Sequence, residues 1–446
     1  MKLHKIIIEN FRCFESLEVD FDEDINVIVG VNGAGKTTLL DAIAIALNDI
    51  NRRLFVDNKN DTGVHYFNKD DFHVFPLQDK NNFRNDNIKV SEKSFIELET
   101  KIESGEFKLQ VNYDLVNNNF VSFRVKSDNS DNIHNTLNDF SNIAKHNSTA
   151  TIPFSAYYLD YRNFVNSPAI NNLFGMRSDR FDAFANCFNG GSSYESMCRW
   201  FFLRTHLEMI EREQCKNWEF KFNDLQAIRD VFNTIFEAEI RIFYGGDTSP
   251  YLMVEMTNNN KTEILKLDQL SAGYRNQISM ILDFAYRLSV ANPHLENPLE
   301  SPGILLIDEI ELHSHPKWQQ TMIPNLRKIF PNTQLIVTTH SPQTLTTVDC
   351  NNVRILKNNA VYHIDETTKG AEAKRMLENI LETESRPPNS EIGKKIKNIF
   401  DLINENKLDT AQHEINKLEN IKKYEHAITE AETLISCKLW EKEIGL

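Results

Sequence analysis

Continuous aliphatic runs stand out along the chain at residues 25–30, 303–310 and 333–340. Runs of this kind are typical of parallel strands that are covered on both faces. Partial alternation of apolar and polar residues at 3–9 and 94–102 is typical of half-buried strands. Related patterns predict further strands at 15–21, 107–116, 117–126, 151–164 (with its exit loop), 251–257 and 263–270, and a short pair after residue 350.

Apolar residues recur at helical spacing in four segments, 39–50, 194–213, 225–237 and 277–291. The same spacing resumes after the Pro387–Pro388 break and predicts a small group of helices at the end of the chain.

Two segments, 51–93 and 127–150, are polar and show no clear period, so we expect loops there. The elements together predict an α/β fold with a mixed sheet, an inserted helical arm and a C-terminal helical tail. The expected domains are a first lobe at 1–166, the helical arm at 167–262, a second lobe at 263–365 and the tail at 366–446.

The composition is that of a globular chain of 446 residues, with 41% hydrophobic and 25% charged residues, which excludes a wholly disordered protein. The formal net charge of −15 excludes a uniformly basic nucleic-acid coat but leaves a local basic patch open. No apolar run is long enough to span a membrane, and the N-terminus lacks a secretory pattern. The 6 scattered cysteines form no CxxC pair, so we expect reduced thiols and a cytoplasmic location.

Residues Gly30 to Thr37 read GVNGAGKT and match the phosphate-loop pattern GxxxxGK[ST], between a predicted strand and a predicted helix. Gly33 and Gly35 permit the close backbone approach with which successive N–H groups surround an anion. The helix N-terminus adds partial positive charge. The alternative is a glycine-rich turn with a chance lysine, which the following motifs disfavour. We therefore expect ATP to be bound by Asn32, Gly33, Ala34, Gly35, Lys36, Thr37 and Thr38.

Two acids follow the aliphatic run at 304–307, where a parallel strand is expected to end. We expect Asp308 and the Thr37 hydroxyl to hold Mg²⁺, and Glu309 to act as general base on the attacking water. His340 follows the next aliphatic run, where a neutral imidazole can hydrogen-bond the γ-phosphate or the water. Taken alone, the two acids could be a solvated strand end and His340 could be a structural histidine. The presence of a phosphate loop in the same chain favours catalytic roles instead.

A fourth motif, LSAGYRNQ at 270–277, opens a predicted helix. With the first three motifs and the opening KIIIENFRCF, it resembles the ABC-type ATPases of the RecF, SMC and OLD-like branch. The segments WFFLRTHLEMIE and KLDTAQHEINKLEN resemble, within that branch, the PtuA-type ATPases of Septu and retron-associated anti-phage systems. The fold implied by the resemblance is an ABC-type P-loop ATPase head.

The resemblance implies that ATP is sandwiched between two copies of the chain. Ser271 and Gly273 of one copy then cap the γ-phosphate held by Lys36 of the other, and Arg12 lies near the nucleotide. A plain N-cap and an ordinary surface arginine are the simpler interpretations of Ser271 and Arg12.

One element of the family is missing, because no glutamine follows the strand at 152–158. Asp160 or Arg162 is the candidate in its place. His313 and His315 offer metal-ligand chemistry, but their HxHP spelling resembles a structural turn of this branch.

The partners implied by the resemblance are further copies of the chain, as ATP-linked dimers or larger homo-oligomers, and an HNH nuclease subunit of the PtuB type. Nucleic acid is reached through the complex, and this chain is not expected to cut it. Two alternatives stay open: a RecF-like DNA-binding accessory ATPase of repair or replication, and an ATPase with an effector of its own. Five arginines are either DNA contacts or a solvated helical face: Arg177, Arg180, Arg199, Arg204 and Arg212.

Overall fold

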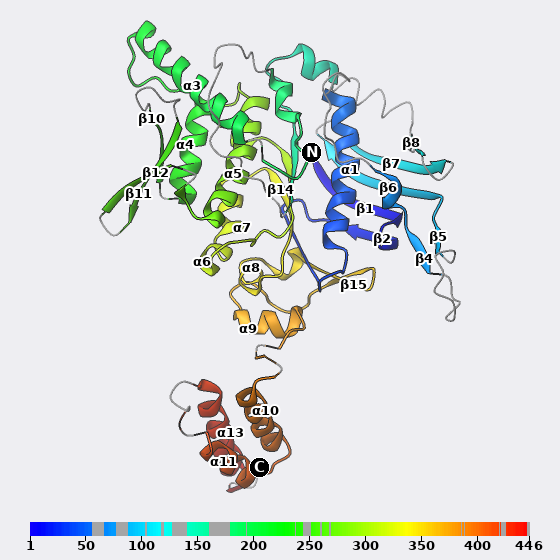
Figure 1. Ribbon diagram of the computed structural model, residues 1–446, viewed down its shortest axis with the longest axis vertical. Helices are drawn as coiled ribbons and strands as arrows, with labels where there is room; N and C mark the ends of the chain where they lie inside the picture. The colour runs from blue at the N-terminus through cyan, green and yellow to red at the C-terminus, as the bar shows by residue number, and fades with distance from the viewer. Residues whose placement is uncertain are drawn as a thin grey trace. The chain divides into compact units, whose positions relative to one another are not determined.

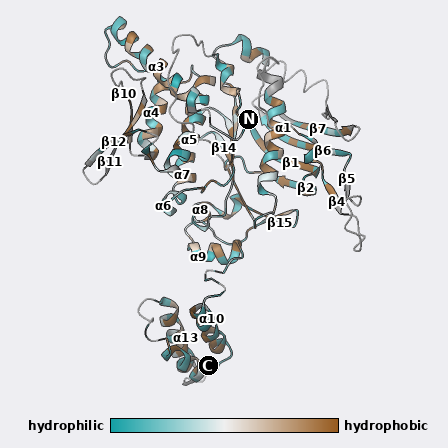
Figure 2. Ribbon diagram, viewed as in Figure 1, coloured by the Kyte–Doolittle hydropathy of each residue, from teal (hydrophilic) through white to brown (hydrophobic). Residues whose placement is uncertain are grey.

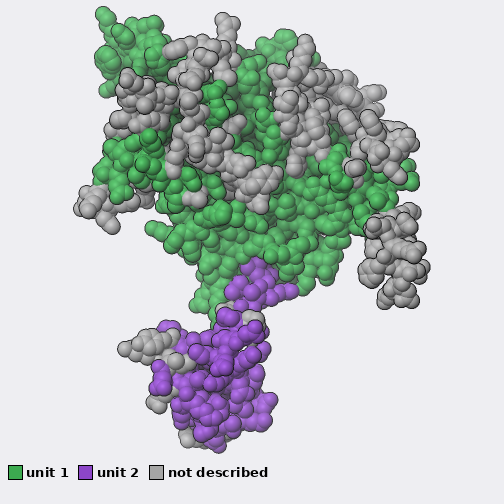
Figure 3. Space-filling model, in the orientation of Figure 1, with its two compact units in different colours: residues 1–376 green, residues 377–446 purple. Residues whose placement is uncertain are grey.

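The computed structural model describes residues 1–55, 67–76, 88–102, 105–116, 120–126, 141–159, 179–192, 194–236, 238–243, 251–258, 261–266, 269–384, 386–387, 389–418, 420 and 425–443. The chain forms two compact units, Met1–Met376 and Leu377–Leu446, coloured green and purple in Figure 3. The finer division into two lobes, an arm and a tail stays a prediction.

Six strands form the central sheet in the order β16-β15-β3-β14-β13-β9, and every neighbouring pair is parallel except β15–β16. The aliphatic runs explain this sheet, because every residue of β9, β13 and β14 is buried. The predicted mixed sheet of an α/β fold is therefore confirmed. Its strands are β3 (Ile25–Val29), β9 (Phe154–Tyr158), β13 (Gly303–Ile307), β14 (Thr333–Thr338), β15 (Val353–Lys357) and β16 (Ala360–His363).

A second sheet is antiparallel throughout, in the order β2-β1-β6-β7-β8. Its members are β1 (Lys2–Phe11), β2 (Phe14–Asp20), β6 (Lys93–Ile102), β7 (Gly105–Val116) and β8 (Phe120–Lys126). Two smaller antiparallel sheets consist of β4 (Val74–Pro76) with β5 (Ile88–Val90), and of β10 (Ala238–Phe243), β11 (Tyr251–Asn258) and β12 (Lys261–Lys266).

Helix α1 (Lys36–Phe55) lies between the two large sheets, in contact with β9 and β13 on one side and β1 and β6 on the other (Figure 1). This position explains why residues 42–47 are all buried. Helix α5 (Ala272–Ala291) contacts β9 and lies on the other side of the central sheet. Figure 2 shows hydrophobic residues along β14, between these helices, and along β1 and β6, on the other side of α1. Further helices of this unit are α3 (Tyr194–Cys215), α4 (Asn223–Phe236), α6 (Pro316–Gln319), α7 (Met322–Ile329), α8 (Pro342–Leu345) and α9 (Ala373–Arg375).

A buried charge network ties α5 to β9. The guanidinium of Arg287 lies 2.9 Å from the carboxylate of Asp283 and donates to the carbonyl oxygens of Ala183 and Ala185. The hydroxyl of Tyr158 on β9 donates to the same carboxylate at 2.7 Å. Both charges are almost wholly inaccessible, so each depends on the other for its stability.

The second unit contains α10 (Glu391–Asn404), α11 (Leu408–Asn416) and α13 (His426–Glu443). The helices pack around one apolar cluster, which confirms the predicted C-terminal helices. The buried members include Ile396, Ile399, Ile403, Leu408, Ala411, Ile415, Ile428 and Ile435.

The prediction of loops at 51–93 and 127–150 was partly wrong. Helix α1 continues to Phe55, β4 and β5 form a short ribbon, and residues 141–146 are helical. The strands β4 and β5 have 3 residues each, too few to show a period.

Several further elements were not predicted, among them β10, α7 and the short helices α6, α8 and α9. Strand β10 follows α4 almost directly, so the helical spacing of α4 masks the start of the strand in the sequence pattern. Helix α7 contains Pro324, which normally argues against a helix but is tolerated in the first turn, where the N–H groups have no helical partner. Within the described ranges, no helix has the length and apolar character needed to cross a membrane.

Candidate functional site

Three of the predicted motifs follow β3, β14 and β13, which are adjacent and parallel. Thr338 of β14 pairs with Ile28 of β3, and Ile307 of β13 pairs with Val337. Because the carboxyl ends of parallel strands meet at one edge, the loops after them are brought together. The structure thus places the phosphate loop, the acidic pair and His340 at the same edge of the central sheet.

The phosphate loop joins β3 to α1, and its shape depends on glycine. The φ angle is +81° at Gly33 and +97° at Gly35, values that residues with a side chain rarely adopt. A β-carbon on Gly35 would lie 2.5 Å from the ring of Phe14, and one on Gly30 would lie 2.4 Å from the carbonyl oxygen of Leu356. The loop is therefore held closely between β2 and β15.

Lys36 begins α1 and folds its side chain back over the loop. Its Nζ donates to the carbonyl oxygen of Gly30 at 3.0 Å and to that of Val31 at 3.3 Å. Burial lowers the pKa of Lys36, while the negative charge of Asp308 opposes that shift. A buried ammonium inside a loop of this shape is placed to bind phosphate oxygens.

Asp308 receives hydroxyl donors on both carboxylate oxygens. Thr37 donates to Oδ2 at 2.7 Å and Thr338 to Oδ1 at 2.5 Å. Adjacent hydroxyl and carboxylate oxygens suit Mg²⁺, a hard cation that prefers oxygen ligands. Glu309 follows in a left-handed conformation, with φ +46°, and its N–H donates to Oγ1 of Thr338 at 2.8 Å. Residues with side chains adopt this conformation rarely, and such strain is concentrated at functional sites.

His340 is half-buried after β14, and its backbone is fixed by a carboxylate from the neighbouring strand end. Glu311 accepts the N–H of His340 through Oε1 and the hydroxyl of Thr339 through Oε2, the latter at 2.7 Å. Burial lowers the pKa of the His340 imidazole, and the positive charge of Lys36 lowers it further. Both effects favour the neutral form of the imidazole, which its expected role requires.

The predicted signature segment begins α5. Ser271 is exposed and is the N-cap, with its hydroxyl accepting the N–H of Tyr274. A β-carbon on Gly273 would lie 2.1 Å from the carbonyl oxygen of His313, so the helix start is in tight contact with the turn after β13. Gln277 strengthens this contact by donating to the carbonyl oxygen of Ile310 at 3.0 Å.

Arg12 lies in the turn between β1 and β2, next to the phosphate loop, against which the Cys13 thiol is packed. Its Nε donates to Asp71 at 2.7 Å, and its Nη1 donates to Asp41 of α1. The hydroxyl of Tyr157 donates to the other oxygen of Asp41 at 2.8 Å. Burial opposes the charge of Arg12, but the two carboxylates outweigh it and raise the pKa. Arg12 thus joins the second sheet to α1.

The remaining predicted residues are placed as follows. Asn32 is exposed in the phosphate loop, Ala34 donates its N–H to the carbonyl oxygen of Val31, and Thr38 hydrogen-bonds the Cys13 thiol. His315 caps α6. Asp160 and Arg162, the candidates for the missing glutamine, lie outside the described residues.

The sequence did not predict three residues that hold the site residues in position. They are Thr338, Glu311 as a partner of His340, and Gln277. The first belongs to the TTHS motif, so its position directly before the expected loop was an available signal. The contacts of Glu311 and Gln277 bridge residues 29 and 33 positions apart, and no local pattern encodes them.

A family model described as an AAA ATPase domain matches residues 1–174 and 205–345, which include the phosphate loop, the acidic pair and His340. The chain belongs to the AAA ATPase domain family. An ATPase domain binds ATP, so the phosphate expected in the loop is that of ATP. The subdivision into the ABC-type branch goes beyond this match.

Among known proteins, the ATPase is 27% identical to "Retron Ec83 probable ATPase" of Escherichia coli, over 98% of this chain and 86% of that protein. It is 23% identical to "Septu protein PtuA" of Bacillus thuringiensis, over 76% of this chain and 72% of that protein. The sequence motifs pointed mainly to PtuA, but the similarity to the retron ATPase is higher and covers more of the chain. Among solved structures, the SMC head domain from Thermotoga maritima has a TM-score of 0.42 and 14% identity, over 82% of this chain and 100% of that one.

Proposed function

We propose that this ATPase uses ATP and Mg²⁺ as a subunit of an anti-phage defence complex, where copies pair through ATP and regulate a separate HNH nuclease. The observation that carries the ATPase part is the 2.7 Å contact between Thr37 and Asp308, which joins the phosphate loop to the acidic strand end. The defence part is supported by the likeness to the retron probable ATPase and to the Septu protein.

Each side chain has a distinct task in the proposed hydrolysis. Lys36 and the N–H groups of the loop bind the phosphates, and Thr37 and Asp308 hold Mg²⁺, which when bound neutralises phosphate charge. Glu309 accepts the proton of the attacking water, aided by the fixed backbone that Thr338 provides. Neutral His340 hydrogen-bonds the γ-phosphate or the water.

Pairing through ATP is supported by the exposure of Ser271 at the start of α5. A helix start with an exposed serine hydroxyl and several N–H groups is an anion site that a second copy's nucleotide can reach. Gly273 is in tight contact with the carbonyl oxygen of His313, in the turn that follows the acidic pair along the chain. Two copies related head to tail then share two nucleotides.

Light scattering of the Glu309→Gln variant tests the pairing, because this variant is expected to keep ATP bound. The mass should double on adding ATP, and the additional change Ser271→Arg should prevent the doubling while ATP binding persists. Ser16→Arg, an exposed serine on β2, is the matched control and should pair normally. Equal masses for the two arginine variants would refute the shared site.

Co-purification with the product of the adjacent gene tests the proposed output. We expect an HNH nuclease to be retained, and its cleavage of DNA to differ between ATP-bound and ATP-free complexes. ATP-dependent DNA binding by the chain alone, with no partner, would instead support the RecF-like alternative. Of the arginines considered for DNA contact, Arg199, Arg204 and Arg212 form ion pairs with Glu195, Asp224 and Glu208, which does not favour that alternative.

A further inference from the structure

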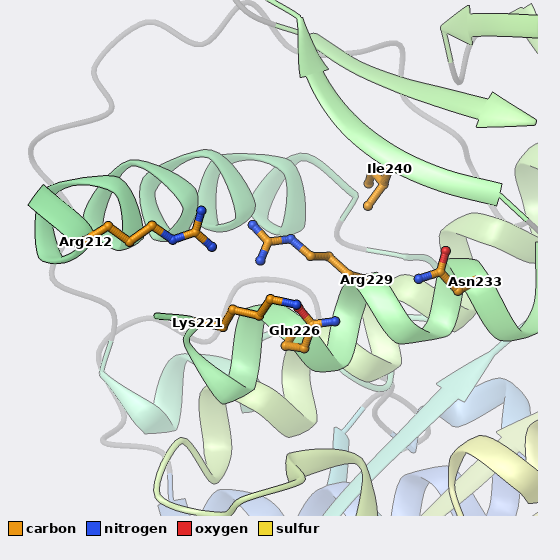
Figure 4. A pocket seen from close by; sticks show the side chains of 6 residues that line it. All are labelled: Arg212, Lys221, Gln226, Arg229, Asn233 and Ile240. Carbon is orange, nitrogen blue, oxygen red and sulfur yellow. The ribbon is translucent and has the colours of Figure 1, made fainter. Parts of the chain in front are cut away.

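A cavity of about 360 Å³ lies between α3, α4 and β10, in a different part of the fold from the phosphate loop. Figure 4 shows its lining: three residues on one face of α4, and one each from α3, from the segment before α4 and from β10. The lining residues are Arg212, Lys221, Gln226, Arg229, Asn233 and Ile240. Small-molecule sites typically have volumes of about 300–1,000 Å³, so the cavity is of ligand size.

The two guanidiniums of the cavity are oriented by a buried carboxylate beneath them. Glu208 is 1% exposed, and its Oε1 accepts from Arg212 at 2.7 Å and from Arg229 at 3.1 Å. Its Oε2 accepts the N–H of Phe222 at 2.9 Å. Both oxygens are thus occupied by these donors. Arginine side chains held in this way lose little conformational entropy on binding a ligand.

Cationic groups predominate among the side chains that line the cavity. In the part of the cavity that the structure describes, three cationic side chains, Arg212, Lys221 and Arg229, stand against the carboxylate of Glu208, which leaves an excess of positive charge. Among the described residues that line the cavity, none carries a carboxylate. Guanidinium and ammonium donors around one space are the groups that bind phosphate in proteins.

The positive charge is confined to the cavity and does not continue along α3. Arg199 is paired with Glu195 in the preceding turns, and Arg204 is paired with Asp224 at 2.7 Å. A nucleic-acid backbone needs a track of cations, whereas a compact anion needs only one cluster. The apolar side chain of Ile240 and the amide of Asn233 supply contacts for the uncharged part of a small ligand.

We propose that this cavity is a second phosphate-binding site, which takes the phosphate group of a small ligand of the nucleotide class. The site is independent of the proposed ATP hydrolysis, since none of its residues belongs to the phosphate loop or to the acidic edge.

Calorimetric titration with inorganic pyrophosphate tests the proposal in the Lys36→Ala background, which removes the main cation of the phosphate loop. We expect one equivalent to bind. Lys221→Gln should weaken binding about tenfold, since one charged hydrogen bond is lost. Asn233→Asp should weaken it as well by repulsion, and both residues are exposed, so the fold should be kept. Arg199→Gln, with the same loss of charge outside the cavity, is the control and should bind as before.

Three results would overturn the proposal: no binding of pyrophosphate in the Lys36→Ala background, equal affinity of the Lys221→Gln and Arg199→Gln variants, or tighter binding of a single-stranded 20-mer that Lys221→Gln weakens. The last result would assign the cavity to nucleic acid. Melting temperatures of all variants, measured in parallel, identify any that fail to fold.

Discussion

The carboxylate of Glu311 accepts the backbone N–H of His340, so the ends of β13 and β14 are fastened together at the proposed catalytic edge. This hydrogen bond fixes the backbone of His340 and does not involve the imidazole ring, which can therefore contact the nucleotide or the attacking water. Its protonation state is set by burial and by Lys36, and that dependence can be measured.

The pH dependence of ATP turnover should reflect this environment. The pKa of His340 lies below its ordinary value of 6.5, so loss of activity through protonation of this residue is expected only below pH 6.5. Steady-state rates between about pH 5 and about pH 8 should show an acidic limb that is missing in His340→Gln, whose side chain does not titrate. An unchanged acidic limb in the variant would assign it to another group. Because the folded state disfavours the charged imidazole, His340 also costs stability as the pH falls through 6.5.

Lys36→Ala should abolish ATP binding. The change removes the buried ammonium that lies over the carbonyl oxygens of the phosphate loop. Equilibrium dialysis with labelled ATP measures the loss, and Lys369→Ala, an exposed lysine outside the site, should bind normally. Retained affinity in Lys36→Ala would contradict the assignment of the loop.

Glu309→Gln should leave ATP bound and slow its hydrolysis by about 10²-fold or more, because an amide cannot accept the proton of the attacking water. Phosphate release under single-turnover conditions measures the effect directly. Glu372→Gln, an exposed acid away from the site, provides the comparison. If the rate is unchanged, a different group activates the water.

Arg287→Met should reduce the free energy of unfolding by about 3–5 kcal/mol, because Asp283 is left as a buried, unpaired charge. The matched change Lys369→Met breaks an exposed ion pair with Asp349 and should cost less than about 1 kcal/mol. Urea titration followed by fluorescence compares the two. Similar midpoints for both variants would show that the buried pair adds little.

Much of this site could be predicted because its motifs follow strands that are recognisable from their aliphatic runs. Once β3, β13 and β14 are taken as parallel neighbours, Lys36, Asp308 and His340 must converge. The pairing of Arg12 with Asp71 could not be predicted in the same way. Asp71 belongs to a 3-residue turn in a segment with no period, and its position depends on the packing of the second sheet.

The conformation of Glu309 was also beyond sequence patterns. No sequence pattern predicts a left-handed φ at a residue other than glycine, because contacts from the surrounding structure enforce it. The hydroxyl of Thr338 both accepts the N–H of Glu309 and donates to Asp308, and this double role becomes visible only when the strands are aligned.

The absence of a side chain at Gly273 lets the beginning of α5 press directly on the carbonyl of His313. With no space between them, displacement of one must displace the other, and the turn between Glu309 and His313 carries the carboxylate that fastens His340. A neighbour that docks on the helix start therefore acts mechanically on the reacting centre through a single short piece of backbone. If copies pair as proposed, binding of a second copy would therefore be coupled directly to the hydrolysis of ATP.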